Sequence, residues 1–361
     1  MGLVGRLTPE VCSDVDVIVL RGEPFQRGLQ QGRALKDAIH ALWHRYESGF
    51  YAKAPPDAVS RVLGNMLRFL DERYPEVVEE LHGVAEGADL TLDEVAKLNF
   101  GSAIGTTLQS EHAPAAACSC VAVVDAPEGA VIARNSDQGD SSQLYYALKI
   151  VIPDKGIPYI GFGEVGGPWV ETAMNAAGLA IGQASAPIQP DQDGYGLPIM
   201  HSTHLVAQYA KSARDAVDYL APVVHAGKGS NLMFADASGD VVALERGHDR
   251  QFTRRPADGV LYFANHSMTP EMQAAVLESR IQQNSEGRVA RYREIFDAER
   301  PDHSTESLRR IISDHGGPVS PCQHGNAAMY TRFACLLIPA RRELRLFRGP
   351  ACTAQPESYF V

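Results

Sequence analysis

The segment around Cys118 holds the residue types with the clearest chemical potential in this chain. Cys118-Ser119-Cys120 opens an apolar run, and a second apolar run ends at Arg134 and Asp137, with Pro-Glu-Gly between the two runs. Two apolar runs joined by such a turn predict a β-hairpin, which brings its two ends together. A thiol at one end would then lie beside a guanidinium and a carboxylate at the other. A nearby cation favours the thiolate, which is the nucleophilic form of cysteine.

The loop before Cys118 suggests how that thiol could become more reactive. Residues 111–117 are small or polar, as expected of an exposed segment that can be cut. Cleavage between Ala117 and Cys118 would make the cysteine N-terminal, so that its own α-amine serves as its base. This is the chemistry of an N-terminal-nucleophile hydrolase. The alternative is a buried structural cysteine, since cysteine is among the residues most often found inside proteins.

Helices and strands are expected in separate stretches of the chain. After a strand at 15–21, apolar residues three to four apart predict helices at about 22–51, 57–71, 75–88 and 91–100. Apolar alternation predicts strands at 119–125, 130–135, 144–152, 157–163, 168–173, 179–183, 231–235, 240–245, 260–264, 330–338 and 343–348. Further helices are expected at 201–220, 271–298 and 304–314. This order predicts an α+β fold in which helices enclose two sheets.

Composition limits the kinds of function that this chain can have. Its 361 residues are 45% hydrophobic and 21% charged, as in an ordinary soluble globular protein. A formal net charge of −11 argues against general nucleic-acid binding, which needs a basic face. No apolar run approaches the ~18 residues of a membrane span, and the N-terminus lacks the features of a signal peptide. With six scattered cysteines and no disulfide framework, we expect a cytoplasmic protein without nucleic-acid or membrane partners.

Several motifs, taken in order, resemble those of the acyl-coenzyme A:6-aminopenicillanic acid acyltransferase family. That family belongs to the N-terminal-cysteine hydrolases, with acid ceramidase and the bile-salt and penicillin V amidases. The similar segments are 21–32, 80–88, 118–120 with Arg134 and Asp137, 174–180, 236–245, 264–266 and 349–352. The resemblance implies a four-layer αββα fold. Residues 1–117 would be a mostly helical propeptide or α-subunit segment, and residues 118–361 the catalytic β-subunit segment of one integrated domain.

The resemblance also implies roles for five residues. Cys118 would be the nucleophile, and the chain would cleave itself between Ala117 and Cys118. Arg134 would stabilise the thiolate or engage the substrate, and Asp137 would orient the new α-ammonium. Asn265 would donate its amide N–H to the oxyanion, a contribution of ~2.7–4 kcal/mol in comparable sites. Structural alternatives are an exposed strand-end arginine for Arg134 and turn positions for Asp137 and Asn265.

Two further residues are weaker candidates for substrate binding. Asn175 precedes a glycine turn and is also typical of a structural turn residue, and Gln183 ends the strand that follows. Two departures from the family pattern concern the same site. Ala117 stands where glycine is common before the nucleophile. Ser136 and Gln138 stand where bulky apolar or aromatic residues are common, which implies a wider or more polar acyl pocket.

The expected function is hydrolysis or transfer of the acyl group of a linear amide, through a thioester on Cys118. The substrate would be a small-molecule amide or acyl donor, and no cofactor is expected. The two fragments of the processed chain would stay together as a heterodimer. The main alternative is an unprocessed, non-catalytic binding protein of the same fold.

Two other classes of protein are less compatible with the sequence. A papain-like protease would carry a Cys-Gly-Ser-Cys-Trp type of signature, which is missing. A metal site would have to gather its ligands from Cys118, Cys120, His201, His204, Cys322 and His324. Cys-x-Cys and Cys-x-His do not match the usual zinc spacings, so no metal is expected.

Overall fold

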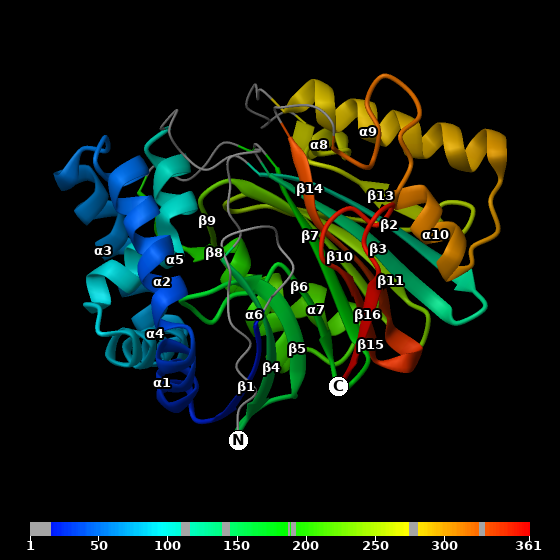
Figure 1. The fold of residues 1–361 in the computed structure, drawn as a ribbon. Coiled ribbons are helices and arrows are strands. Elements are labelled where there is room, and N and C mark those ends of the chain that lie inside the picture. Colours follow the sequence, from blue (N-terminus) through cyan, green and yellow to red (C-terminus); the bar gives the residue numbers. More distant parts are fainter. Residues whose placement is uncertain are drawn as a thin grey trace.

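Two β-sheets stacked face to face form the centre of the molecule (Figure 1). The computed structural model describes residues 16–109, 116–138, 145–186, 188, 193–273, 281–324 and 329–361. The strands are β1 (Asp16–Gly22), β2 (Ala116–Ala126), β3 (Gly129–Gln138), β4 (Tyr146–Pro153), β5 (Tyr159–Glu164), β6 (Thr172–Asn175), β7 (Leu179–Ala186), β8 (Leu197–Pro198), β9 (His225–Ala226), β10 (Gly229–Asp236), β11 (Val241–Arg246), β12 (Gln251–Arg254), β13 (Val260–Phe263), β14 (Tyr330–Ile338), β15 (Glu343–Phe347) and β16 (Pro356–Phe360). One sheet has the order β1-β4-β5-β6-β7-β10-β11-β12 and the other β13-β2-β3-β14-β15-β16, while β8 and β9 pair separately.

Helices cover the outer faces of both sheets. They are α1 (Pro24–Ala34), α2 (Lys36–Tyr46), the π-helical turn η1 (Glu47–Tyr51), α3 (Pro56–Arg73), α4 (Pro75–Ala88), α5 (Leu92–Thr107), α6 (Ile199–Tyr209), α7 (Ala213–Leu220), α8 (Pro270–Gln273), α9 (Gln282–Glu294), the π-helical turn η2 (Ile295–Glu299), α10 (Thr305–Ile312) and the 3₁₀ turn η3 (Pro339–Arg341). Helices α6 and α7 pack on the eight-stranded sheet, and α9 and α10 pack on the six-stranded one. This stacking confirms the α+β, four-layer αββα fold.

Strand β2 shows how the sequence builds two cores at once. Side chains alternate between the two faces of a strand. Cys118, Cys120 and Ala122 therefore point into the core between the two sheets. Val121 and Val123 point the other way, into the core beneath α9 and α10. This alternation places the thiol of Cys118 in the interior of the sandwich.

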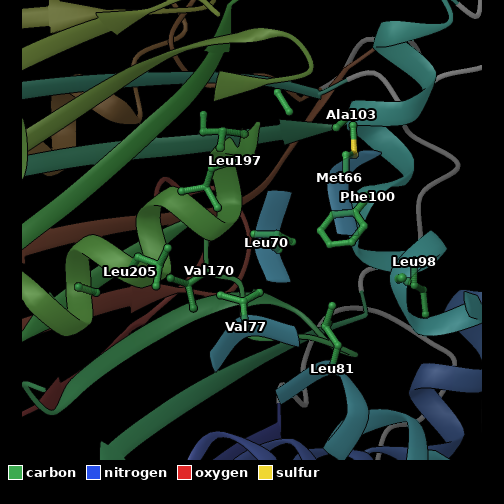
Figure 2. Close-up of a cluster of buried hydrophobic side chains, with 14 of the residues drawn as sticks. Met66, Leu70, Val77, Leu81, Leu98, Phe100, Ala103, Val170, Leu197 and Leu205 are labelled. Carbon is green, nitrogen blue, oxygen red and sulfur yellow. The ribbon is translucent and has the colours of Figure 1, made fainter. Parts of the chain in front are cut away.

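The chain before the hairpin contributes a strand as well as helices. Strand β1 pairs in parallel with β4, from Asp16 opposite Ala147 to Gly22 opposite Pro153. Helices α3, α4 and α5 share one buried cluster with α6, and Figure 2 shows part of it, with Met66, Phe100, Leu197 and Leu205 among the labelled side chains. The described part of segment 1–117 thus shares a sheet and a core with segment 118–361. None of the described helices is both long and apolar enough to cross a lipid bilayer.

Helices α1 and α4 cross at very short range. Gly28 on α1 faces the backbone of α4, so that a Cβ added there would lie 2.0 Å from the main-chain oxygen of Glu80. A Cβ on Gly83 of α4 would in turn lie 2.1 Å from the main-chain oxygen of Phe25. The crossing also buries an ion pair, with Arg27 Nη2 2.6 Å from Glu80 Oε2. The motifs at 21–32 and 80–88 are therefore the two sides of one contact.

The G83A variant is expected to be less stable than the wild type by about 1–3 kcal/mol, because the added methyl group forces the two helices apart. Gly64 is the matched control, since it also lies inside a helix, but an added Cβ there would meet no described atom within 4 Å apart from the backbone of its own helix. The G64A variant is expected to gain up to ~1 kcal/mol from the better helix propensity of alanine. Urea unfolding of the three proteins measures both changes. Equal stability of G83A and wild type would contradict the close crossing.

Several elements differ from those expected from the sequence. The helix expected at 201–220 is two helices, because α6 ends at Tyr209 and the Ser212 hydroxyl caps α7 by accepting from the Asp215 N–H. Strands β12 and β16 were not expected, and the strand expected at 168–173 begins only at Thr172. Part of the helical block expected at 271–298 lies outside the described residues. A capping box begins α5, since the Thr91 hydroxyl accepts from the Glu94 N–H and the Glu94 carboxylate accepts from the Thr91 N–H.

Candidate active site

The hairpin of β2 and β3 brings the candidate catalytic residues together. Its register places Ala117 opposite Asp137 and Cys118 opposite Ser136, with Arg134 two residues before Ser136 on β3 and opposite Cys120. The hairpin lies in the middle of the six-stranded sheet, between β13 and β14. The hairpin thus brings the Cys118 thiol against the Arg134 guanidinium, whereas the Asp137 carboxylate contacts Arg288 and Thr331.

The Cys118 thiol lies against a buried arginine. Arg134 Nη2 donates to Cys118 Sγ at 3.2 Å and to Glu171 Oε2 at 2.9 Å, while its Nε donates to the main-chain oxygen of Gln183 at 2.9 Å. The Ser136 hydroxyl also donates to Glu171 Oε2, at 2.9 Å, and lies 3.9 Å from the thiol. The Arg134 side chain is fully buried, so the alternative of an exposed strand-end arginine does not apply.

Burial and charge act in opposite directions on the Cys118 thiol. Burial raises the pKa of Cys118, the Arg134 guanidinium lowers it, and the carboxylates of Glu171 and Asp137 raise it again. The net result is a pKa above the ordinary value. The uncleaved thiol therefore stays protonated at neutral pH, and Arg134 alone does not produce a thiolate. A base is needed as well.

A second buried arginine organises the main chain of the nucleophile. Arg288 on α9 donates through Nη1 to the main-chain oxygen of Cys118 at 2.6 Å and to Asp137 Oδ2 at 3.3 Å. Its Nη2 donates to Asn265 Oδ1 at 2.8 Å. The other Asp137 oxygen accepts from the Thr331 hydroxyl at 2.7 Å. Arg288 thus ties together Cys118 and two of the residues selected from the sequence.

Asp137 is held without contact with solvent. Burial raises its pKa to about 6, against the opposing effects of the Arg288 charge and the Thr331 hydrogen bond. At neutral pH the side chain is therefore mainly a carboxylate, and it balances the buried charge of Arg288. These contacts join β3 to α9 and β14, so Asp137 is not a turn cap.

Asn265 faces the nucleophile with its oxygen. Its Oδ1 accepts from the main-chain N–H of Cys118 at 2.7 Å, and its Nδ2 donates to the main-chain oxygen of Ser185 at 2.7 Å. Its own main-chain N–H donates to the Ser285 hydroxyl at 2.7 Å. The residue is fixed from three directions, and it recognises the nitrogen that would become the α-amine of Cys118.

Arg288 and Glu171 were not selected from the sequence. Arg288 shares the buried face of α9 with Ser285 and Tyr292, at positions i, i+3 and i+7. The helical spacing of Arg288 from Tyr292, which places both on one face of α9, is the sequence pattern that could have indicated a buried arginine. Glu171 follows Trp169 just before a strand, and no pattern in its neighbourhood marks it.

The two candidates for substrate binding lie in different surroundings. Asn175 ends β6, where its Nδ2 donates to the main-chain oxygens of Ala207 and Ala210 and its Oδ1 accepts from the N–H groups of Ala177 and Leu179. These bonds join the β6–β7 turn to the end of α6. Asn175 is absent from the described residues that line the cavity above Cys118, whereas Gln183 is among them.

A cavity of about 460 Å³ opens above Cys118. One wall comes from the N-terminal helical segment: Arg45, Tyr46, Gly49, Phe50, Lys53, Leu98, Asn99, Ser102 and Ala103. The other comes from the strand-rich segment: Cys118, Gln138, Tyr146, Glu164, Trp169, Glu171, Gln183, Ser185, Pro198, Ile199, Met200, Ala226 and Lys228. Both segments are therefore needed to enclose it.

Three of the polar side chains that line this cavity contribute to its electrostatics. Burial raises the pKa of Glu164 to about 8, so this carboxyl group is mainly uncharged at neutral pH. Burial lowers the pKa of Lys228, although the nearby Cys118 and Glu171 favour its charged form. Among the residues that the structure describes, the buried side-chain oxygen of Gln183 has no hydrogen-bond partner. An unpaired buried acceptor is costly, so Gln183 is ready to bind a donor from a ligand.

The residues considered for a metal site do not come together around the thiol. Within the described ranges, the one group of histidine and cysteine ligands that converges is His315, Cys322, His324 and Cys352. Cys118 and Cys120 lie between the sheets instead. His201 and His204 are buried on α6.

The αββα sandwich, with a cysteine at the start of a central strand and a cavity above it, is the architecture of the N-terminal-nucleophile hydrolases. The family model of acyl-coenzyme A:6-aminopenicillanic acid acyl-transferase matches residues 124–341. The chain belongs to this family.

A curated relative from Archaeoglobus fulgidus, described as an uncharacterized protein, is 24% identical over 303 residues. The match covers 71% of this chain and 51% of that protein, so this chain spans about half the length of the relative.

Three solved structures are similar over about two thirds of this chain. A point mutant of the conjugated bile acid hydrolase from Clostridium perfringens has a TM-score of 0.45 and 12% identity, covering 68% of this chain and 97% of that one. Penicillin V acylase from Agrobacterium tumefaciens has a TM-score of 0.43 and 17% identity, and the match covers 67% of this chain and 84% of that one. The Caenorhabditis elegans ortholog of N-acylethanolamine-hydrolyzing acid amidase has a TM-score of 0.46 and 14% identity, and the match covers 68% of this chain and 100% of that one.

Proposed function

We propose that this protein is an N-terminal-cysteine amidohydrolase or acyltransferase that first cleaves its own chain before Cys118. The observation that carries the proposal is the position of Cys118. Its thiol lies at the base of a cavity and against Arg134, while its main-chain N–H is bound by Asn265. Membership of the acyl-transferase family supports the same activity.

The bonds that break and form in self-cleavage belong to Cys118, Ala117 and water, and a water molecule acts as the base that carries the thiol proton to the departing nitrogen. The sulfur attacks the carbonyl carbon of Ala117, and the peptide bond breaks as its nitrogen takes up a proton. The product is a thioester between Ala117 and the Cys118 side chain, with a free α-amine. Water then adds to the thioester, so that Ala117 leaves as a carboxylic acid and the thiol is restored. The new α-amine is placed to keep the Asn265 oxygen as its partner.

The processed cysteine carries its own base. An α-amine has a reference pKa of about 7.7–8.0, close to that of a thiol, so it takes the thiol proton near neutrality. The thiolate attacks the carbonyl carbon of the substrate amide, and the α-ammonium returns the proton to the leaving amine. The acyl-enzyme is then released by water or by an amine. The Asn265 side-chain amide has two N–H bonds, and one of them donates to the Ser185 carbonyl. In an oxyanion hole, Asn265 would donate the other N–H to the oxyanion.

The cavity supports an amide with an apolar acyl group and an acidic amine portion. Its volume lies within the ~300–1,000 Å³ of small-molecule sites. Its largest apolar side chains include Phe50, Leu98, Trp169, Ile199 and Met200. Lys228 offers an amine with a lowered pKa near Cys118 and pairs well with a carboxylate. N-acyl amino acids combine both features, and they are the substrates to test first.

The proposal includes a lasting association of the two fragments. The division at 117/118 leaves β1 in one fragment and its partner β4 in the other. It also leaves one wall of the cavity in each fragment. The fragments are therefore expected to form a heterodimer, and separation should abolish the cavity.

Intact mass and N-terminal sequencing of the purified protein test this proposal. In proportion to chain length, cleavage before Cys118 divides the 39.1 kDa chain into fragments of about 13 and 26 kDa. The larger fragment is expected to begin Cys-Ser-Cys-Val, and both are expected to elute together in size-exclusion chromatography. A chain that stays at 39.1 kDa under all conditions would contradict self-cleavage and favour the unprocessed binding protein.

A further inference from the structure

Four soft side chains converge on one spot outside the active site. His315, Cys322, His324 and Cys352 each offer a ligand atom, and these four atoms all lie within 4.8 Å of one another. We call this group the Cys2His2 cluster. Its individual separations are 2.7 Å between the two imidazole Nε2 atoms, 3.1 Å from His324 Nε2 to Cys352 Sγ, 3.7 Å between the sulfurs and 3.9 Å from Cys352 Sγ to His315 Nε2.

These four separations lie within about 0.7 Å of those around a tetrahedral zinc ion, the two imidazole nitrogens being the pair that must move apart. Zn–S bonds near 2.3 Å and Zn–N bonds near 2.0–2.1 Å place neighbouring ligand atoms about 3.3–3.8 Å apart at tetrahedral angles. Both cysteines are free thiols, so neither sulfur is held in a disulfide. Two thiolates and two neutral imidazoles balance the charge of Zn²⁺, and a soft S₂N₂ set selects zinc over hard cations.

The cluster joins three segments that are separate in the sequence. His315 follows α10, Cys322 and His324 lie shortly before β14, and Cys352 follows β15. The spacing Cys322-x-His324 matches no usual zinc pattern. The remaining ligands come from positions 7 residues before and 28 residues after this pair, and only the fold brings them together.

The cluster also borders the support of the active site. The Thr331 hydroxyl accepts from the Gln323 N–H at 2.8 Å and donates to Asp137 Oδ1 at 2.7 Å. Asn135 Nδ2 on β3 donates to the main-chain oxygens of Ile312 and Pro321, at 2.8 and 2.9 Å. The loop that carries the ligands is thus fastened to the strand of Asp137, but its ligands do not reach Cys118.

We propose that His315, Cys322, His324 and Cys352 bind one zinc ion as a closed structural site that locks the 312–324 loop and the 349–354 turn onto the six-stranded sheet. Four protein ligands leave no open position for substrate, which is the mark of a structural rather than a catalytic zinc site. The proposal revises the expectation of no metal. It is independent of the proposed function, because no step of amide hydrolysis involves the ion.

Metal analysis of the full-length, tag-free protein tests this site. Reduced protein dialysed against zinc and then against metal-free buffer is expected to retain about one zinc ion per chain, as closed four-ligand sites do. The C352S and H315A variants are expected to bind zinc at least ~100-fold more weakly. Removal of a residue that only supports a ligand lowers metal affinity by about 10–100-fold, and loss of a ligand itself is expected to cost more. The H44A variant, which replaces an exposed histidine of α2, is expected to keep the ion.

Cobalt supplies a readout that needs neither activity nor a variant. Co²⁺ added to the reduced, metal-free wild type is expected to give the intense visible bands of tetrahedral coordination and a thiolate-to-metal band in the near ultraviolet. Zinc should then remove these bands. Absence of the bands, or zinc retained undiminished by both C352S and H315A, would overturn the proposal. So would a Cys322–Cys352 disulfide found by peptide mapping of protein purified without reductant.

Discussion

The C118A variant is expected to remain a single 39.1 kDa chain and to lose hydrolysis of N-acyl amino acids. The thiol is the atom that attacks both the Ala117 carbonyl and the substrate, so its removal stops both reactions. Loss of a covalent nucleophile lowers kcat by up to about 10⁶-fold. Intact mass reports the first effect, and amine release from an N-acyl amino acid reports the second.

Cys120 is the matched control for this variant. It lies two residues further along β2, points into the same core and is fully buried. Its thiol contacts the main chain of Gln183 at 4.0 Å and makes no contact with the bond to be cut. The C120A variant is expected to be cleaved and active, at a cost of about 1 kcal/mol in stability. If C120A also fails to mature while C118A folds normally, the assignment of the nucleophile is wrong.

The R288M variant is expected to lose about 3–5 kcal/mol of stability, because it leaves Asp137 as a buried charge without its cation. It also removes the donor that holds Asn265 Oδ1 and the donor to the main-chain oxygen of Cys118. Slow or absent self-cleavage should therefore accompany the loss of stability. Urea unfolding and the rate of appearance of the two fragments measure the two effects.

A second substitution separates these two effects. D137N removes the buried charge while keeping an oxygen for the Thr331 hydroxyl, so R288M/D137N is expected to regain part of the stability. Self-cleavage is expected to stay impaired in the double variant, because Asn265 still lacks its arginine. R293M is the surface control on the same helix and should stay within ~0.5 kcal/mol of wild type. Full recovery of cleavage in the double variant would show that Arg288 acts only through stability.

The candidate site divides into residues that the sequence marks and residues that it does not. Cys118, Arg134 and Asp137 lie on one hairpin, and their relative positions follow from a short turn and a two-residue period. Arg288 lies 170 residues from Cys118 along the chain, and its helix also carries a partly buried arginine, Arg291, and an exposed one, Arg293. Only the packing of α9 against β2 distinguishes the buried one.

Asn265 illustrates a finer limit. Its proximity to Cys118 was expected, but which end of the amide faces the nucleophile depends on Arg288 and Ser185, from two other elements. For Asn175, the local turn followed from the sequence but the hydrogen-bond partners did not. Its turn was recognised, yet its hydrogen bonds go to the end of α6 because the β6–β7 turn packs there.

The sequence by itself determined the helical first part, the strand-rich second part, the β2–β3 hairpin and the family resemblance. Each rests on information within a few residues: apolar period, turn chemistry and short motifs. The tertiary structure alone decided the pairing of Arg288 with Asp137, the two-segment cavity and the Cys2His2 cluster. These features depend on contacts between segments that are distant in the sequence. The packing of whole layers sets the geometry of such contacts, and no local sequence pattern encodes it.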